Sequence, residues 1–169
     1  MSTVSHSELL AKKILDHYFF AFRKLDNYKP VWLQGLELDR FYSDLGVAVE
    51  FQGKQHFLRT SELGQSQEAF DRGLKNDQRK RQLVESQGLK LIALDIFDLT
   101  PERIKRYVSH IVQVGLTYST FKGLNEVAFK LKTLRLDKEP DKSLFRSADR
   151  LSRSKTKPKK SFWARLFGG

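Results

Sequence analysis

The stretch 36–57 constrains the fold most, because it has the pattern of a β-hairpin followed by a polar run. Two runs of alternating residues flank the turn sequence Ser-Asp-Leu-Gly at 43–46, which is typical of a four-residue connection. A turn centred in this sequence places Asp39 directly opposite Glu50 on one face of the hairpin. The other face then carries apolar residues toward a core: Leu36, Leu38, Val47, Val49 and Phe51.

The predicted register brings the negative charges of Asp39 and Glu50 close together. Directly opposed side chains on neighbouring strands have Cβ atoms about 5 Å apart, and like charges at that spacing destabilise a sheet. Mg²⁺ would offset this repulsion, since it binds one or two carboxylates together with water and substrate phosphate. The pair therefore predicts a metal-dependent phosphoryl-transfer site. The alternative is a surface ribbon with solvated carboxylates, which leaves the polar run 52–56 unexplained.

The acidic residue, the hairpin turn and the motif Glu-x-Gln-Gly-x-Gln-His at 50–56 together resemble the PD-(D/E)xK nuclease superfamily, in the branch similar to Vsr-type and restriction-endonuclease-like proteins. The resemblance covers about 30–95 and includes Asp77-x-x-Lys80 on an expected helix. It implies an α/β restriction-endonuclease-like core, in which helices flank a small mixed sheet. It also implies Mg²⁺-dependent hydrolysis of DNA phosphodiester bonds, with Mn²⁺ as a substitute, in a repair, recombination or mobile-element pathway.

The sequence departs from this superfamily at Gln52, where a lysine is usual. A neutral amide cannot supply a cation to the attacking water or the phosphate, so a basic group from elsewhere would be needed. The resemblance assigns metal binding to Asp39, Glu50 and the Phe51 carbonyl, and catalysis to Asp39, Glu50, Gln52 and a basic group among Lys54, His56 and Lys80. Residues expected to contact nucleic acid are Lys54, Gln55, Lys75, Arg79 and Arg81. The alternative is an inactive nuclease-fold protein that binds nucleic acid or acts as an adaptor.

The charge of the chain agrees with a polyanionic partner. Its formal net charge is +11 and its pI is near 9.9, which favours nucleic acid over an anionic membrane. The absence of cysteine excludes disulfides, zinc ribbons and thiol catalysis. Because no apolar run approaches the roughly 20 residues that span a bilayer, we expect a soluble, cytoplasmic protein.

Much of the positive charge lies near the end of the chain. We predict one domain over 1–136 and a basic tail without fixed structure over 137–169, since residues 138–169 hold ten Lys/Arg and three Asp/Glu. Such a tail would add salt-dependent affinity for nucleic acid. The tail ends in the apolar peptide 161–169, which is typical of a docking segment for a protein partner.

Local signals predict the remaining elements. A capping box at Ser5 and Glu8 starts a helix that should end near Leu25, and Glu8 is also the candidate acidic residue that a first helix contributes in the superfamily. Later segments are a helix over 66–87, a strand over 89–94 and a helix from Thr100-Pro101 to about Leu116. A last helix within 117–136 could pack on the domain, pair with a second copy in a homodimer, or lie along DNA.

Overall fold

The computed structural model describes residues 5–52 and 67–153 and has a mixed α/β architecture. A four-stranded sheet has the order β1 (Lys24–Tyr28), β2 (Leu38–Tyr42), β3 (Val47–Gln52) and β4 (Lys90–Asp95). The first three strands are antiparallel, and β4 runs parallel to β3. The small mixed sheet flanked by helices is therefore confirmed. Its parallel strands β3 and β4 need a crossover connection, and α2 (Gln67–Ser86) is part of that connection.

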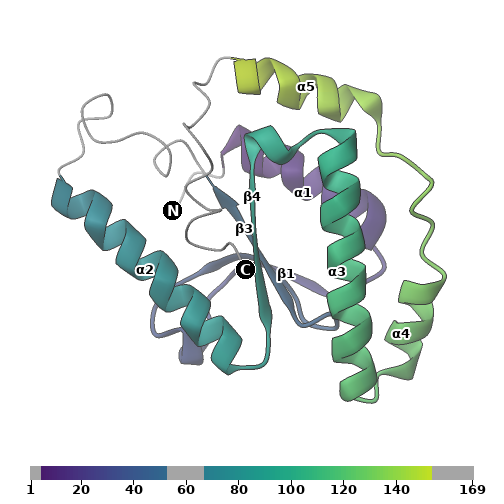
Figure 1. Cartoon of the computed structure of the whole chain (residues 1–169), viewed down its shortest axis with the longest axis horizontal. Helices are drawn as coiled ribbons and strands as arrows, with labels where there is room; N and C mark the ends of the chain where they lie inside the picture. Colours follow the sequence, from purple (N-terminus) through teal and green to yellow (C-terminus); the bar gives the residue numbers. More distant parts are fainter. Residues whose placement is uncertain (1–4, 53–66, 154–169) are drawn as a thin grey trace.

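Helices cover both faces of the sheet. Figure 1 shows α2 on one side and α1 (His6–Phe19) and α3 (Pro101–Phe121) on the other. The short helices η1 (Val31–Leu33) and η3 (Ile96–Asp98) flank the strands, and α4 (Asn125–Lys132) and α5 (Lys142–Arg153) complete the described chain. The larger core lies against α1, α3 and α5, and a smaller core lies between the sheet, η1 and α2. None of the helices in this part of the chain is both long and apolar enough to cross a membrane.

The hairpin has the predicted turn and register. Its pairs are Arg40 with Val49, Phe41 with Ala48 and Tyr42 with Val47, so the next positions along the strands are Asp39 and Glu50. Gly46 closes the turn with φ +62°, and a Cβ at this position would collide with the ring of Tyr118. The backbone conformation and the close approach of α3 thus both favour glycine here.

The prediction that Leu36 and Leu38 share a face with Val47, Val49 and Phe51 is wrong. Leu36 and Leu38 belong to the smaller core beneath α2, whereas the three β3 residues contact the larger core. Leu38 and Phe41, three residues apart, even lie on one face, which strict strand alternation does not allow. The alternation of side chains in β2 is broken at Asp39. The residue opposite it on β1 is Asn27, which has a left-handed φ of 52°.

Two helix predictions also need correction. The first helix ends at Phe19 rather than near Leu25, because Leu25 pairs with Phe41 in the unpredicted strand β1. The helix from Pro101 continues to Phe121 instead of ending near Leu116, and Gly123 with φ +69° separates it from α4. The single helix expected within 117–136 is therefore divided between two elements.

The folded domain extends past its predicted limit at residue 136. Within the segment 137–169, expected to lack fixed structure, α5 is a helix that places Phe145 and Ala148 in the larger core. Apolar residues at helical spacing outweigh the basic composition around them. Residues 154–169, including the apolar peptide 161–169, lie outside the described residues.

Arg40 is the most deeply buried charged residue of the described chain, at 2% exposure. Its guanidinium holds Asp26 of β1 through two bonds of 2.7 and 3.0 Å and Asp16 of α1 through one of 2.7 Å. It also donates to the Lys12 carbonyl oxygen at 3.1 Å. Burial alone would raise the pKa of Asp26, but the hydrogen bond from Arg40 lowers it below its usual value. One side chain thus joins α1 to the β1–β2 pair.

We expect Arg40→Met to lower the free energy of unfolding by about 3 kcal/mol, because it removes the partner of two acidic groups. Arg40→Lys should have a smaller effect, since an ammonium retains the charge but cannot hold Asp26 through a planar fork. Urea denaturation measures both effects. Arg23→Met, which removes an exposed arginine next to β1, is the matched control and should change stability by less than about 0.5 kcal/mol. Equal effects of Arg40→Met and Arg23→Met would contradict this role.

Candidate active site

Asp39 and Glu50 each reach across to the other strand. The Phe51 N–H donates to Asp39 Oδ2 at 2.7 Å, and the Asp39 N–H donates to Glu50 Oε1 at 3.3 Å. These two bonds take the place of main-chain pairing at the point where β2 becomes irregular. Glu50 is buried, with 7% exposure. The structure therefore brings together the two carboxylates that the hairpin register predicts.

Lys80 of α2 contacts this pair directly. Its Nζ lies 2.6 Å from Glu50 Oε2, and the side chains of Lys80 and Glu50 are only 13% and 10% exposed. Val84, one turn later on α2, is fully buried in the smaller core, and residues i and i+4 lie on the same helical face. Packing of Val84 thus directs Lys80 toward the sheet, where the Asp-x-x-Lys motif places its cation beside Glu50.

Lys12 of α1 is a second buried cation near the site, and the sequence analysis missed it. Its Nζ lies 2.7 Å from Glu8 and 5.9 Å from the centre of the Phe51 ring. Glu8 and Lys12 both act electrostatically on Asp39. A sequence signal existed, because Lys12 is three residues before Leu15 and seven before Phe19, which are both fully buried. This spacing places Lys12 on the inward stripe of α1.

Burial disfavours negative charge at the site. It raises the pKa of Glu50 to about 7, an effect that the nearby Asp39 charge increases and the Lys80 ion pair opposes. The pKa of Asp39 is also raised, again mainly by burial, although the Phe51 N–H favours its charged form. Lys80 therefore compensates only part of the negative charge.

The donor set fits a hard divalent cation. Two opposed carboxylates with raised pKa values offer oxygen ligands of the kind that Mg²⁺ takes, with water and phosphate completing its shell. Within residues 5–52 and 67–153 there is no group of three or more His, Cys, Asp or Glu side chains placed to hold a metal. A bound ion would need ligands beyond Asp39 and Glu50, such as the Phe51 carbonyl, water or substrate. The role of that carbonyl stays a prediction.

The other predicted site residues have different positions. Gln52 is buried at 8% exposure and pairs with Asp95 of β4, two residues beyond Glu50. Arg79 hydrogen-bonds the side chain of Gln34, and Arg81 forms an ion pair of 2.9 Å with Glu85. Lys75 is exposed on α2, so it can still contact nucleic acid. Lys54, Gln55 and His56 lie outside the described residues.

The raised pKa of Glu50 predicts a specific pH dependence of stability. The folded state binds this proton more tightly than the unfolded state does, so the contribution of Glu50 is most favourable below pH 4.5 and declines as the pH rises through about 7. The full decline is at most about 3 kcal/mol. Glu50→Gln lacks this titration, and its stability relative to wild type should therefore increase between pH 5 and pH 8 in urea denaturation with EDTA.

Glu37→Gln is the matched control, since Glu37 is a less buried acid paired with Lys29 at 2.8 Å. Its stability difference from wild type should vary little over this range. A Glu50→Gln difference that is equally independent of pH would show that Glu50 titrates normally in the folded protein.

Comparison with known proteins adds no relative, since no family model, no curated protein and no solved structure matches this chain.

Proposed function

We propose that the protein is a Mg²⁺-dependent endonuclease that hydrolyses phosphodiester bonds in DNA, and that its sheet and flanking helices form a restriction-endonuclease-like core. The observation that supports this most is the directly opposed pair of Asp39 and the buried Glu50, with Lys80 bonded to Glu50. The positive charge of the chain, +11, suits a polyanionic substrate. A repair, recombination or mobile-element pathway stays a prediction.

In the proposed reaction, a water oxygen forms a bond to phosphorus while one phosphorus–oxygen bond of the backbone breaks. The leaving oxygen takes a proton, and the proton lost by the water goes to solvent or to a nearby base. Asp39 and Glu50 would hold the metal ion, which when bound lowers the pKa of water and neutralises charge on the phosphate. The hydrogen bonds to Asp39 and Glu50 fix their carboxylates before substrate arrives.

Two lysines can replace the cation that is missing at position 52. The Lys80 ammonium has three donors and uses one on Glu50, so it can also hydrogen-bond a phosphate oxygen or the attacking water. Lys12 approaches from the α1 side, where it is buried and pairs with Glu8. Gln52, with its amide near the ends of β3 and β4, would orient the water rather than supply charge.

We expect Asp39→Asn and Glu50→Gln each to reduce Mg²⁺-dependent DNA cleavage by about a hundredfold or more, because each removes a charge aimed at the reacting centre. Both changes preserve side-chain shape, so DNA binding in EDTA should persist. A gel assay on linear and branched DNA, with Mg²⁺ and with chelator, measures cleavage. Glu37→Gln is the matched control and should cleave like wild type. Equal cleavage by all four proteins would rule out this site.

We expect Lys80→Met to lower stability mainly at high pH, because it leaves the Glu50 carboxylate buried without its cation. The loss should be about 3 kcal/mol at pH 8 and smaller at pH 5, where Glu50 with its pKa of about 7 is mostly protonated. Urea denaturation at both pH values measures this change. Lys75→Met, on an exposed position of α2, should have little effect at either pH. A loss independent of pH would indicate that Lys80 acts through packing alone.

A catalytically inactive protein that only binds nucleic acid is the second candidate. It is favoured by the contact of Lys80 with Glu50, since an internal ammonium can substitute for a metal ion, and by the amide at Gln52. Calorimetric titration with Mn²⁺ separates the two functions. Binding that Asp39→Asn abolishes supports the nuclease, whereas no binding by wild type or variant supports the inactive protein.

A further inference from the structure

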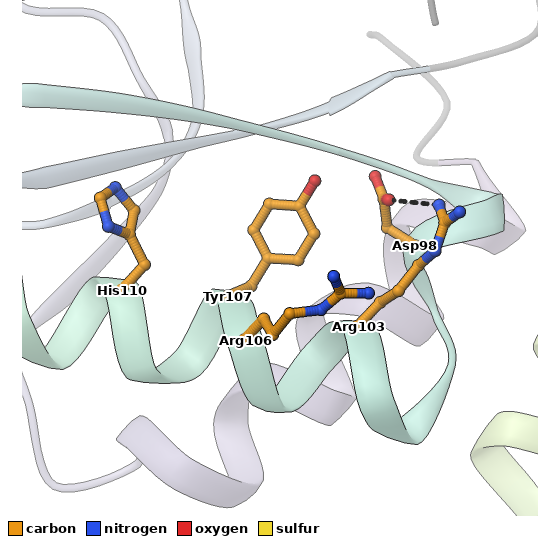
Figure 2. A pocket seen from close by; sticks show the side chains of 5 residues that line it. All are labelled: Asp98, Arg103, Arg106, Tyr107 and His110. Carbon is orange, nitrogen blue, oxygen red and sulfur yellow. Dashed lines mark hydrogen bonds and ion pairs between the residues drawn. The ribbon is translucent and has the colours of Figure 1, made fainter. Parts of the chain in front are cut away.

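A polar pocket lies beside α3 and the segment that follows β4, and neither Asp39 nor Glu50 lines it. We name it the α3 pocket; it has a volume of about 420 Å³ and is lined by Asp98, Arg103, Arg106, Tyr107 and His110. Figure 2 shows the side chains of Tyr107 and His110 rising from α3 on the same side as the Asp98–Arg103 ion pair. Four of the five residues have the spacing i, i+3, i+4 and i+7, which places them on one helical face.

The α3 pocket has an excess of positive charge. Asp98, its one acidic residue, is paired with Arg103 at 3.0 Å, and its other carboxylate oxygen accepts the Asp95 N–H at 3.0 Å. Arg106 is exposed, and within residues 5–52 and 67–153 it forms no ion pair. The guanidinium of Arg106 therefore has its donors available to a ligand.

These side chains suit a phosphate group. An arginine guanidinium is a planar fork that matches phosphate oxygens through two parallel hydrogen bonds. The Tyr107 hydroxyl is held near Asp98 and keeps its proton, because burial and the Asp98 charge both raise its pKa. Because its one proton is donated to Asp98, Tyr107 lines the pocket as a neutral group and leaves phosphate binding to the arginines. The single half-buried aromatic ring of the pocket favours a backbone phosphate over recognition of a base.

The position of the α3 pocket relative to Glu50 agrees with a shared substrate. Glu50 pairs with Ala93 of β4, and Asp95 lies two residues further along that strand. Strand spacing and rise place the Cα atoms of Glu50 and Asp95 about 8 Å apart. Asp95 caps η3 by accepting the N–H groups of Phe97 and Asp98, so η3 leads directly from the strand end to the pocket.

We propose that the α3 pocket binds a second backbone phosphate of the nucleic acid whose scissile phosphate lies at Asp39 and Glu50; this inference rests on the proposed function. The pocket would fix the register of the strand without reading its sequence, since phosphate contacts carry no base information. Arg106 is the main contact, and Arg103 is held in place by Asp98.

The test measures DNA binding by fluorescence anisotropy in EDTA, where no cleavage occurs. We expect Arg106→Ala to weaken binding about tenfold and to reduce the slope of log K against log salt by about 1, equally for DNAs of different sequence. Lys105→Ala is the matched control, since it removes a neighbouring exposed cation that does not line the pocket. Arg106→Lys should recover part of the affinity, because it retains the charge but not the fork.

Equal weakening by Arg106→Ala and Lys105→Ala, or no weakening by Arg106→Ala, would overturn the inference. The inference would also be overturned if inorganic phosphate stabilised the protein through Arg106 while DNA binding did not depend on Arg106. Failure of the proposed function is distinguishable from these outcomes. If the wild type never cleaves DNA but Arg106→Ala selectively weakens binding, the pocket is supported and the nuclease function is wrong.

Discussion

The geometry of the candidate site depends on the buried guanidinium of Arg40. It binds Asp16 and the Lys12 carbonyl on α1 and grips Asp26 on β1, while its own backbone belongs to β2. Asp39 is the preceding residue, so the same contacts that join helix to sheet also fix where its carboxylate lies. A buried charge with several partners permits few alternative arrangements. The position of Asp39 is therefore fixed by contacts with α1 and β1, on the side of the sheet opposite α2.

A second constraint is the unfavourable charge balance at the site itself. Burial raises the pKa values of Asp39 and Glu50, the Glu8 charge adds to the effect at Asp39 and the Asp39 charge adds to it at Glu50. Lys80 offsets only part of this effect. A protein selected for stability alone would gain by replacing such a pair with apolar residues. Conflicts between local stability and side-chain choice are concentrated at functional sites. Under the proposed function, a bound divalent cation with a phosphate would remove this conflict.

Much of the site could be predicted because it depends on local signals. The turn at 43–46 sets the register of Asp39 and Glu50, and helical spacing in α2 directs Lys80 inward. The remaining errors have non-local causes. Strand β1 could not be predicted because its partner Arg40 is distant in sequence, and the wrong face for Leu38 follows from the left-handed Asn27 across the ladder. The helix α5 was not predicted because the basic composition of its segment indicates a disordered tail, although its apolar residues have helical spacing.

The parallel pairing of β3 with β4 connects the candidate active site to the segment that leads to the α3 pocket. It places Gln52 beside Asp95, so the segment that follows β4 begins next to the end of the strand that carries Glu50. Lys12 of α1 and Lys80 of α2 both act on Asp39, whereas Arg106 of α3 lies in the separate pocket. A single basic helix would attract a polyanion in many orientations. Under the proposed function, two lysines beside one carboxylate pair, together with the α3 pocket, would restrict the path of a backbone, as cleavage at a defined bond requires.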